Sequence, residues 1–204
     1  MRALTLLLIA VVAAGCADAV SNAGLARAAT NKIERFLITK PDLPMGYALE
    51  QRKRFLAGSC PSRIATRQVS TRKLAALGLR GCALAVFSKE VASGGGASTL
   101  NNPESVAFLM RDERAASAAL RALRTALLVV PPDSGVEAHS LRAPRLGDQA
   151  PRGIMLTLGD FSIFNYLWRR GNVIAWVESS DVLGDFNAGK TLKLARRLDA
   201  RGRD

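Results

Sequence analysis

The clearest pattern along the chain lies in two neighbouring segments, residues 161–168 and 172–178, which are apolar at both odd and even positions. Successive side chains of a strand point to opposite faces of a sheet, so this pattern predicts strands that are buried on both faces. Aromatic and β-branched residues dominate both segments, and Arg169-Arg170-Gly171 between them predicts the turn of a β-hairpin. Two arrangements fit: a central hairpin covered on both sides, or a sheet with helices on one face and a ligand or partner groove on the other.

Helical periodicity marks two longer segments. Residues 111–130 have apolar side chains at spacings of three and four with arginines on the opposite side, and a Pro-Pro pair ends the predicted helix. The last segment has the same periodicity, and we predict a helix that is capped at Asp185 and ends near Ala200. A shorter helix is predicted to end at Leu77, with Gly78 in the left-handed stop position.

The remaining apolar runs are short and are bounded by turn residues, which predicts further strands. They are residues 47–56, 83–89, 105–110, 135–141 and 153–158. Strands that mostly form hairpins, together with a few helices, are typical of an α+β domain. We therefore predict an antiparallel sheet of about six strands with two or three helices packed on it, in a single domain over residues 31–204.

The start of the chain has a different layout: a positive charge at Arg2, an unbroken apolar run over residues 3–14, and small residues before Cys16. This order is typical of an export signal, and the run is shorter than the about 20 residues that span a bilayer. The ending A-A-G-C resembles the lipobox of bacterial lipoproteins. The resemblance implies a signal peptide over residues 1–15, a palmitate-bearing lipid on Cys16, and a tether over residues 16–30 that holds the domain at the cell membrane, outside the cytoplasm.

The formal net charge is +12, with 22 arginines and 7 lysines. One interpretation is affinity for an anionic partner, such as phospholipid head groups or an acidic envelope ligand. The other is codon bias, because arginine and alanine both use G/C-rich codons. Nucleic acid is not expected as a partner of an exported protein, and the sequence contains no signature of a nucleic-acid-binding module.

Of the three cysteines, the lipobox uses one, which leaves Cys60 and Cys82. In an oxidising compartment such a pair is expected to form a disulfide. The bridge would close a loop of about 20 residues and stabilise the fold by about 3 kcal/mol. Free or metal-binding thiols are the alternative, although the chain offers few further Cys or His ligands. We predict no metal site and no cofactor.

Candidate catalytic groups are few. His139 is the only histidine, and Ser140 beside it would point to the opposite face of a strand. No G-x-S-x-G motif is present, and the glycine-rich residues 93–98 match no phosphate-binding pattern, so we predict a flexible loop there. Two carboxylates that converge in the fold would suffice for a hydrolase. We interpret the following acids instead as turn and cap residues: Asp148, Asp160, Asp181 and Asp185.

The predicted hairpin also supplies the candidate ligand-binding residues. Tyr166, Trp168 and Trp176 would form an aromatic platform for a ligand, or they pack in the core and across strands. Arg169 and Arg170 lie at the predicted hairpin tip, where they would meet an anion or lie in a solvated turn.

Four short motifs carry a resemblance to a known group of proteins. They are D-L-P-M-G-Y (residues 42–47), L-G-D-Q-A (146–150), W-R-R-G-N (168–172) and L-A-R-R-L-D-A-R (194–201). Together they are similar to small secreted lipoproteins and sensor-like domains of high-G/C Gram-positive bacteria and their relatives. The resemblance implies an extracytoplasmic α+β domain, in some cases the outer sensor part of a membrane protein, and it supplies no catalytic residues.

These observations predict a membrane-anchored extracytoplasmic lipoprotein whose domain binds a ligand or protein partner and is not an enzyme. The alternative is a secreted hydrolase that uses carboxylates or His139. A third hypothesis is a basic domain that lies on anionic lipid.

Overall fold

A computed structural model describes residues 31–56, 59–60, 63–64, 67–68, 71–93, 96–144, 146–148 and 152–203. The predicted signal peptide, Cys16 and the predicted tether of residues 16–30 lie outside this range. Among the described residues, no helix has both the length and the apolar composition that crossing a membrane requires.

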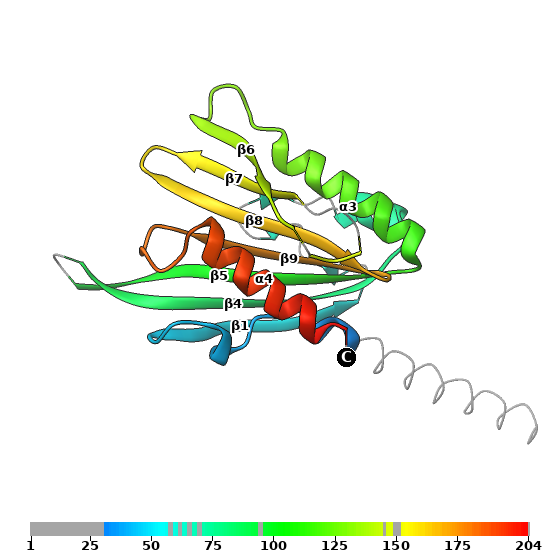
Figure 1. Cartoon of the computed structure of the whole chain (residues 1–204), viewed down its shortest axis with the longest axis horizontal. Helices are drawn as coiled ribbons and strands as arrows, with labels where there is room; N and C mark the ends of the chain where they lie inside the picture. The colour runs from blue at the N-terminus through cyan, green and yellow to red at the C-terminus, as the bar shows by residue number, and fades with distance from the viewer. Residues whose placement is uncertain are drawn as a thin grey trace, which may run out of the picture.

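The centre of the domain is a seven-stranded antiparallel sheet with the strand order β1-β4-β5-β9-β8-β7-β6 (Figure 1). The strands are β1 (Tyr47–Leu56), β4 (Leu79–Ser93), β5 (Gly96–Met110), β6 (Val136–Arg142), β7 (Arg152–Leu158), β8 (Phe161–Arg170) and β9 (Val173–Ser180). A separate small ladder pairs β2 (Arg63–Ile64) with β3 (Arg67–Gln68). The α+β class is confirmed, and the sheet has one strand more than the about six predicted.

The predicted loop over residues 93–98 is shorter in the structure, because β4 and β5 pair along almost their whole length. Ser93 and Gly96 are partners at the end of this ladder. Glycine and serine disfavour strands, but here the continuous backbone pairing of a long hairpin outweighs that local preference.

The helical elements are η1 (Lys40–Asp42), α2 (Thr71–Ala76), α3 (Glu113–Leu128) and α4 (Ala188–Arg201), and residues 31–34 are also helical. The helix predicted over residues 111–130 corresponds to α3, and Asp112 caps it by accepting a hydrogen bond from the backbone N–H of Ala115. Gly78 has the left-handed conformation expected after α2, with a φ of 98°.

The predicted cap of the last helix was wrong by two residues. Asn187, not Asp185, caps α4 by accepting a hydrogen bond from the backbone N–H of Lys190. The carboxylate of Asp185 instead binds Lys89 at 2.7 Å and accepts a hydrogen bond from the Tyr47 hydroxyl at 3.2 Å. Both residue types make good helix caps, so the choice between them depends on these tertiary partners.

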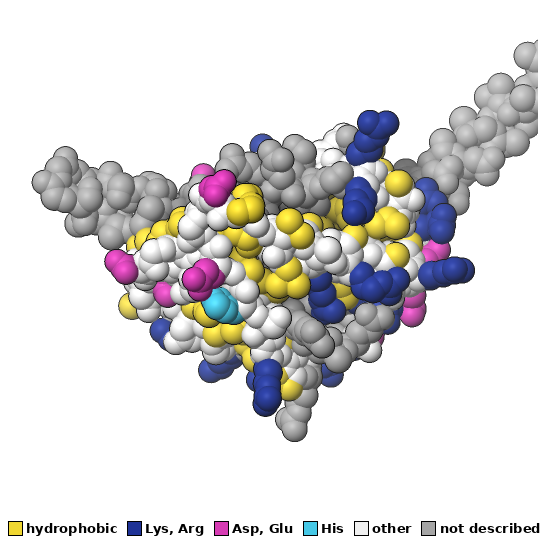
Figure 2. All heavy atoms as spheres, turned by 90° about the horizontal axis from the view of Figure 1, so that it is seen from above, with side chains coloured by type: hydrophobic (Ala, Val, Ile, Leu, Met, Phe, Trp, Pro, Cys, Tyr) yellow, Lys and Arg dark blue, Asp and Glu magenta, His cyan; other side chains and the backbone are white. Residues whose placement is uncertain are grey.

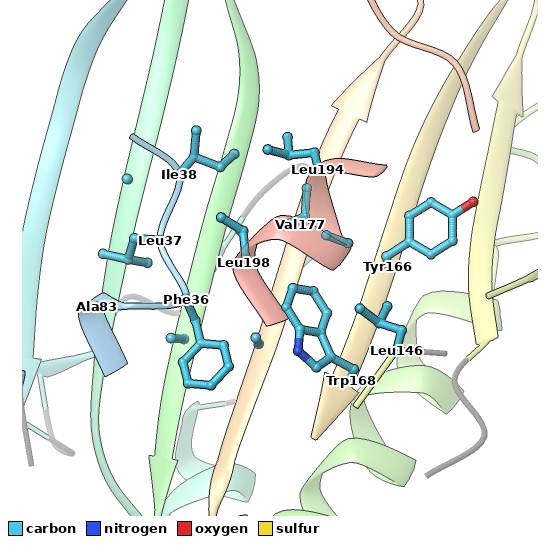
Figure 3. Packing of buried hydrophobic residues seen from close by; sticks show 14 of the residues in the cluster. Phe36, Leu37, Ile38, Ala83, Leu146, Tyr166, Trp168, Val177, Leu194 and Leu198 are labelled. Atoms are coloured by element: carbon cyan, nitrogen blue, oxygen red, sulfur yellow. The ribbon is translucent and has the colours of Figure 1, made fainter. Parts of the chain in front are cut away.

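The sheet divides the core into two clusters. Helices α2 and α3 cover one face, hereafter the α3 face, and α4 together with residues 33–38 covers the other, the α4 face. Phe36, Leu37 and Ile38 of the N-terminal segment pack beside Leu194 and Leu198 of α4 (Figure 3). The middle of β8 and almost all of β9 are buried on both faces. Of the two arrangements that fit the sequence, the structure has the hairpin covered on both sides.

Cys60 and Cys82 form the predicted disulfide, with their Cα atoms 6.0 Å apart. Cys82 lies in β4 and both cysteines belong to the core of the α3 face. The bridge therefore fixes the connection that follows edge strand β1 to the interior of the sheet.

The chain has two tyrosines, Tyr47 and Tyr166, and both are buried on the α4 face. Burial raises the pKa of Tyr47, and the charge and hydrogen bond of Asp185 raise it further. Burial also raises the pKa of Tyr166.

We expect that the folded protein forms almost no phenolate near pH 10, where an exposed tyrosine is about half ionised. Because each folded pKa exceeds the unfolded value, the unfolded state loses its phenol protons first, and the free energy of unfolding falls as the pH rises above about 10. Ultraviolet titration of the phenolate alongside denaturant unfolding measures both effects. Substantial phenolate in the folded protein at pH 10 would contradict the burial of these rings, and a Tyr47→Phe variant should lose less stability on alkalinisation.

Candidate functional site

The three predicted platform residues lie in the core. Tyr166, Trp168 and Trp176 are each 1% exposed. Tyr166 and Trp168 face α4, whereas Trp176 belongs to the opposite, α3-face cluster. They therefore do not form one surface, and core packing, the second interpretation of the sequence, describes their positions. Ligand binding by these rings stays a prediction, and it would require a helix to move aside.

Hydrogen bonds fix two of these rings. The Tyr166 hydroxyl donates to the backbone oxygen of Ala188 at the start of α4, at 3.0 Å. On the other face the Trp176 indole N–H donates to Oδ1 of the fully buried Asn165 at 2.9 Å. Tyrosine and tryptophan commonly take such a partner when they are buried.

Arg169 and Arg170 both bind carboxylates of this chain. Arg169 points to the α3 face, where its Nη1 donates to Glu113 Oε2 at 3.2 Å and to the backbone oxygen of Gly171 at 2.8 Å. Arg170 points to the α4 face and binds Asp199. Their side chains are only 10% and 23% exposed. This low exposure differs from the solvated turn that the sequence suggested, and anion binding by Arg169 and Arg170 stays a prediction.

Asp199 of α4 is the carboxylate around which this arrangement is built, and it is fully buried. Arg170 donates to it through Nε at 3.1 Å and through Nη2 at 2.6 Å. Its Oδ2 also accepts from the backbone N–H of Gly147 and from Arg203, both at 3.2 Å. The hydrogen bonds to Asp199 raise the pKa of Arg170, so this guanidinium stays charged.

Asp148 binds the turn of the hairpin through both the backbone and a side chain of that turn. Its carboxylate accepts from the backbone N–H of Gly171 at 2.6 Å and from Arg170 Nη1 at 2.7 Å. The preceding Gly147 has a φ of 73°, and a Cβ there would lie 2.6 Å from the backbone oxygen of Arg169. Only glycine fits this close approach.

Three of the four motifs that carry the resemblance meet in this network, and the fourth binds the same helix α4. Asp148 joins L-G-D to the hairpin turn of W-R-R-G-N, and Arg170 joins that turn to Asp199 of the terminal motif. Arg201 of the same terminal motif binds Asp42 of D-L-P-M-G-Y at 2.9 Å. We call the Arg169, Arg170, Glu113, Asp148 and Asp199 side chains the arginine clamp. It connects the central hairpin to both helices, which is a structural role.

His139, the candidate base of the hydrolase alternative, is at the surface. His139 lies on edge strand β6, where its Nε2 is 3.3 Å from Glu137 Oε2 and both side chains are about half exposed or more. Figure 2 shows the histidine beside an acidic side chain, with hydrophobic side chains gathered nearby. Among the described residues, no three His, Cys, Asp or Glu side chains are grouped closely enough to hold a metal ion.

The predicted turn acids mostly bind backbone groups or charged side chains. Asp148 belongs to the arginine clamp, and Asp181 accepts from the backbone N–H of Ser162 at 2.7 Å. Asp185 binds Lys89 and Tyr47, as described above. Asp160 is exposed in the turn between β7 and β8.

The sequence analysis missed a polar row inside the sheet. Glu104, Glu178 and Asn165 are direct neighbours across β5, β9 and β8, on the face that carries Trp176. Asn165 is fully buried and Glu178 is 8% exposed. Glu104 and Glu178 both have interaction partners. Single polar residues at inward positions of otherwise apolar strands were the signal that could have found this row.

No family model matches the sequence, and no curated protein is similar to it at a significant level. Among solved structures, the extracellular domain of PknH from Mycobacterium tuberculosis is similar, with a TM-score of 0.58. The alignment covers 85% of this chain and 95% of that domain, at 8% sequence identity. At this identity the similarity shows that the two chains share a fold.

The arginine clamp can be tested through Asp199. An Asp199→Asn substitution keeps the size of the side chain but leaves Arg170 with one carboxylate partner, so we expect a loss of about 3 kcal/mol in the free energy of unfolding. The matched control is Asp160→Asn at the exposed turn, which should change it by less than about 0.5 kcal/mol. Urea unfolding measures both variants, and equal small effects would show that the clamp does not stabilise the fold.

Proposed function

We propose that this protein is a membrane-anchored extracytoplasmic lipoprotein whose domain recognises a partner through its surface and catalyses no reaction. The observation that carries the proposal is the burial of both faces of the β8–β9 hairpin. A sheet covered in this way leaves its central aromatic residues no groove for a ligand, so recognition falls to the outside of the domain.

Three observations support the location. The fold is shared with the extracellular domain of PknH. The Cys60–Cys82 disulfide is typical of proteins in oxidising compartments. The order of charge, apolar run and small residues before Cys16 is that of an exported lipoprotein.

The surface offers features that suit a protein partner. Strands β1 and β6 are the two edges of the sheet, and exposed edges can pair with an extended segment of another protein. On β1, Leu49 is 49% exposed and Leu56 is 76% exposed, and Met45 just before the strand is 94% exposed. Exposed apolar side chains along an edge strand supply hydrophobic contact beside the backbone groups that can pair with another segment.

The hydrolase alternative stays a prediction. Among the described residues, His139 forms an ion pair with Glu137, and it lies on edge strand β6. Glu104 and Glu178 are directly opposed carboxylates, but Glu178 is almost completely buried and both have partners within the protein. Acids that already have partners within the protein favour a structural role.

The anchor is tested by a Cys16→Ser substitution. Because the serine hydroxyl cannot replace the predicted lipid attachment, we expect the protein to move from the membrane fraction to the soluble fraction of its host. A Ser21→Ala variant alters the same segment without touching the predicted attachment site and should stay with the membrane. Unchanged membrane retention of the Cys16→Ser variant would overturn the anchor.

Surface recognition is tested by native mass spectrometry of the protein purified from its host. We expect the mass of the chain and its lipid with no small molecule bound in a one-to-one ratio. A non-covalent small molecule at that ratio would mean that the interior opens to a ligand, and the proposal would fail.

A further inference from the structure

We propose that the outward side of α4 docks on the surface of an anionic membrane. This inference rests on the proposed membrane anchor and adds which side of the domain faces the lipid. The surface is defined by the four exposed basic side chains Lys190, Lys193, Arg196 and Arg197, hereafter the α4 basic face.

The charge of this face is of one sign because the only acid of the helix points inward. Asp199 is fully buried and bound to Arg170. Lys193 and Arg197 have no ion-pair partner among the described residues, and the bonds of Lys190 and Arg196 go to the backbone oxygens of Asp185 and Pro144. All four positive charges therefore remain available to an external anion.

The described acidic side chains around the helix do not neutralise its charge, because other bases already bind them. Asp185 pairs with Lys89, and Asp42 pairs with Arg201. Glu34 of the N-terminal segment forms an ion pair with Arg54 of β1. Residues 31–40 add three exposed basic residues: Lys32, Arg35 and Lys40.

Helix α3, on the other side of the sheet, does not present charge of a single sign. Helix α3 exposes Glu113, whose side chain is 72% exposed, and Arg111 pairs with Asp112. Its last residue, Leu128, is 45% exposed. The positive charge is thus arranged asymmetrically, because α4 itself exposes no acidic side chain whereas α3 does.

The path of the chain favours a membrane over a soluble polyanion. Arg201 at the end of α4 donates to the backbone oxygen of Leu37 at 2.7 Å, so the chain enters the domain beside the end of this helix (Figure 1). Cys16 lies 15 residues before Asn31, which allows a separation of at most about 50 Å. The 14-residue helix is about 21 Å long. A lipid on Cys16 would therefore keep the whole α4 basic face within reach of the bilayer, where tethering makes weak contacts effective.

The contact is electrostatic, without insertion into the bilayer. The exposed large apolar side chains among the described residues all lie outside α4. Attraction between surface charges is screened at high ionic strength, so docking should be reversed by salt while the lipid anchor holds.

Lysine footprinting tests the orientation directly. The full chain from its host is added to phosphatidylcholine vesicles with and without phosphatidylglycerol, and acetylation rates of its lysines are compared by mass spectrometry. We expect acetylation of Lys190 and Lys193 to slow at least about fivefold on anionic vesicles only and to recover in molar salt. Lys53, which is exposed on the α3 face of β1, should be unaffected. Equal rates at Lys193 on both kinds of vesicle would overturn the proposal.

A matched pair of variants tests the cause. Lys193→Glu with Arg197→Glu should abolish the protection of Lys190, whereas Arg114→Glu with Arg121→Glu makes the same change of charge on exposed positions of α3 and should leave it intact. If the first pair lowers the melting temperature, the corresponding glutamine substitutions replace it. Equal loss of protection in both pairs would mean that net charge, not this face, attracts the lipid.

Two further outcomes are informative. One distinguishes a membrane from a soluble polyanion, and the other distinguishes failure of the lipid anchor from failure of α4 docking. If soluble polyphosphate protects Lys193 as strongly as vesicles do at equal phosphate concentration, a membrane is the wrong occupant. If the chain carries no lipid, the anchor fails, but the comparison of lysines on added vesicles still decides whether α4 docks.

Discussion

The whole domain depends on the position of β9 in the middle of the sheet, where the strand has no face in water. Seven of its eight residues are buried. A strand in that position needs an apolar layer on each side, and α3 and α4 with the N-terminal segment provide the two layers. The same requirement buries the central aromatic side chains of both strands beneath the helices. The helical layers on the two faces of the described sheet therefore have one cause, the two-sided apolar pattern of β8 and β9.

The end of this hairpin has to accommodate charge and not apolar surface, because two arginines follow directly after buried residues. Each arginine turns to a different face of the sheet and meets an acid that belongs to a helix, Glu113 or Asp199. A buried ion pair adds little net stability compared with apolar packing, but removing one partner is costly. Such a clamp fixes how the helices sit on the sheet, which explains why short motifs far apart in the sequence meet there.

Local pattern was sufficient for much of the fold: the hairpin, α3, the stop at Gly78 and the Cys60–Cys82 bridge followed from periodicity, turn chemistry and cysteine count. Local pattern could not predict the strand register or which residues distant in the sequence bind each other. Trp176 pairs with Leu167 rather than with Trp168, and this register places the two tryptophans on opposite faces. Similarly, nothing near Arg170 in the sequence indicates that its acid would come from residue 199 of the last helix. The fold was thus largely predictable and the candidate site was not.

The strand order has a consequence for how the protein is made. Strands β1, β4 and β5 form one side of the sheet, α3 connects β5 to β6 at the far edge, and β9 returns to the middle. Glu104 and Glu178 are therefore neighbours although they are 74 residues apart in the sequence. During synthesis, which starts at the N-terminus, the edge of β5 that pairs with β9 stays unpaired until residues 173–180 have been made. Unpaired strand edges are templates for association between chains. The interval between the appearance of β5 and that of β9 is therefore when the nascent protein is most prone to aggregate and most in need of a chaperone.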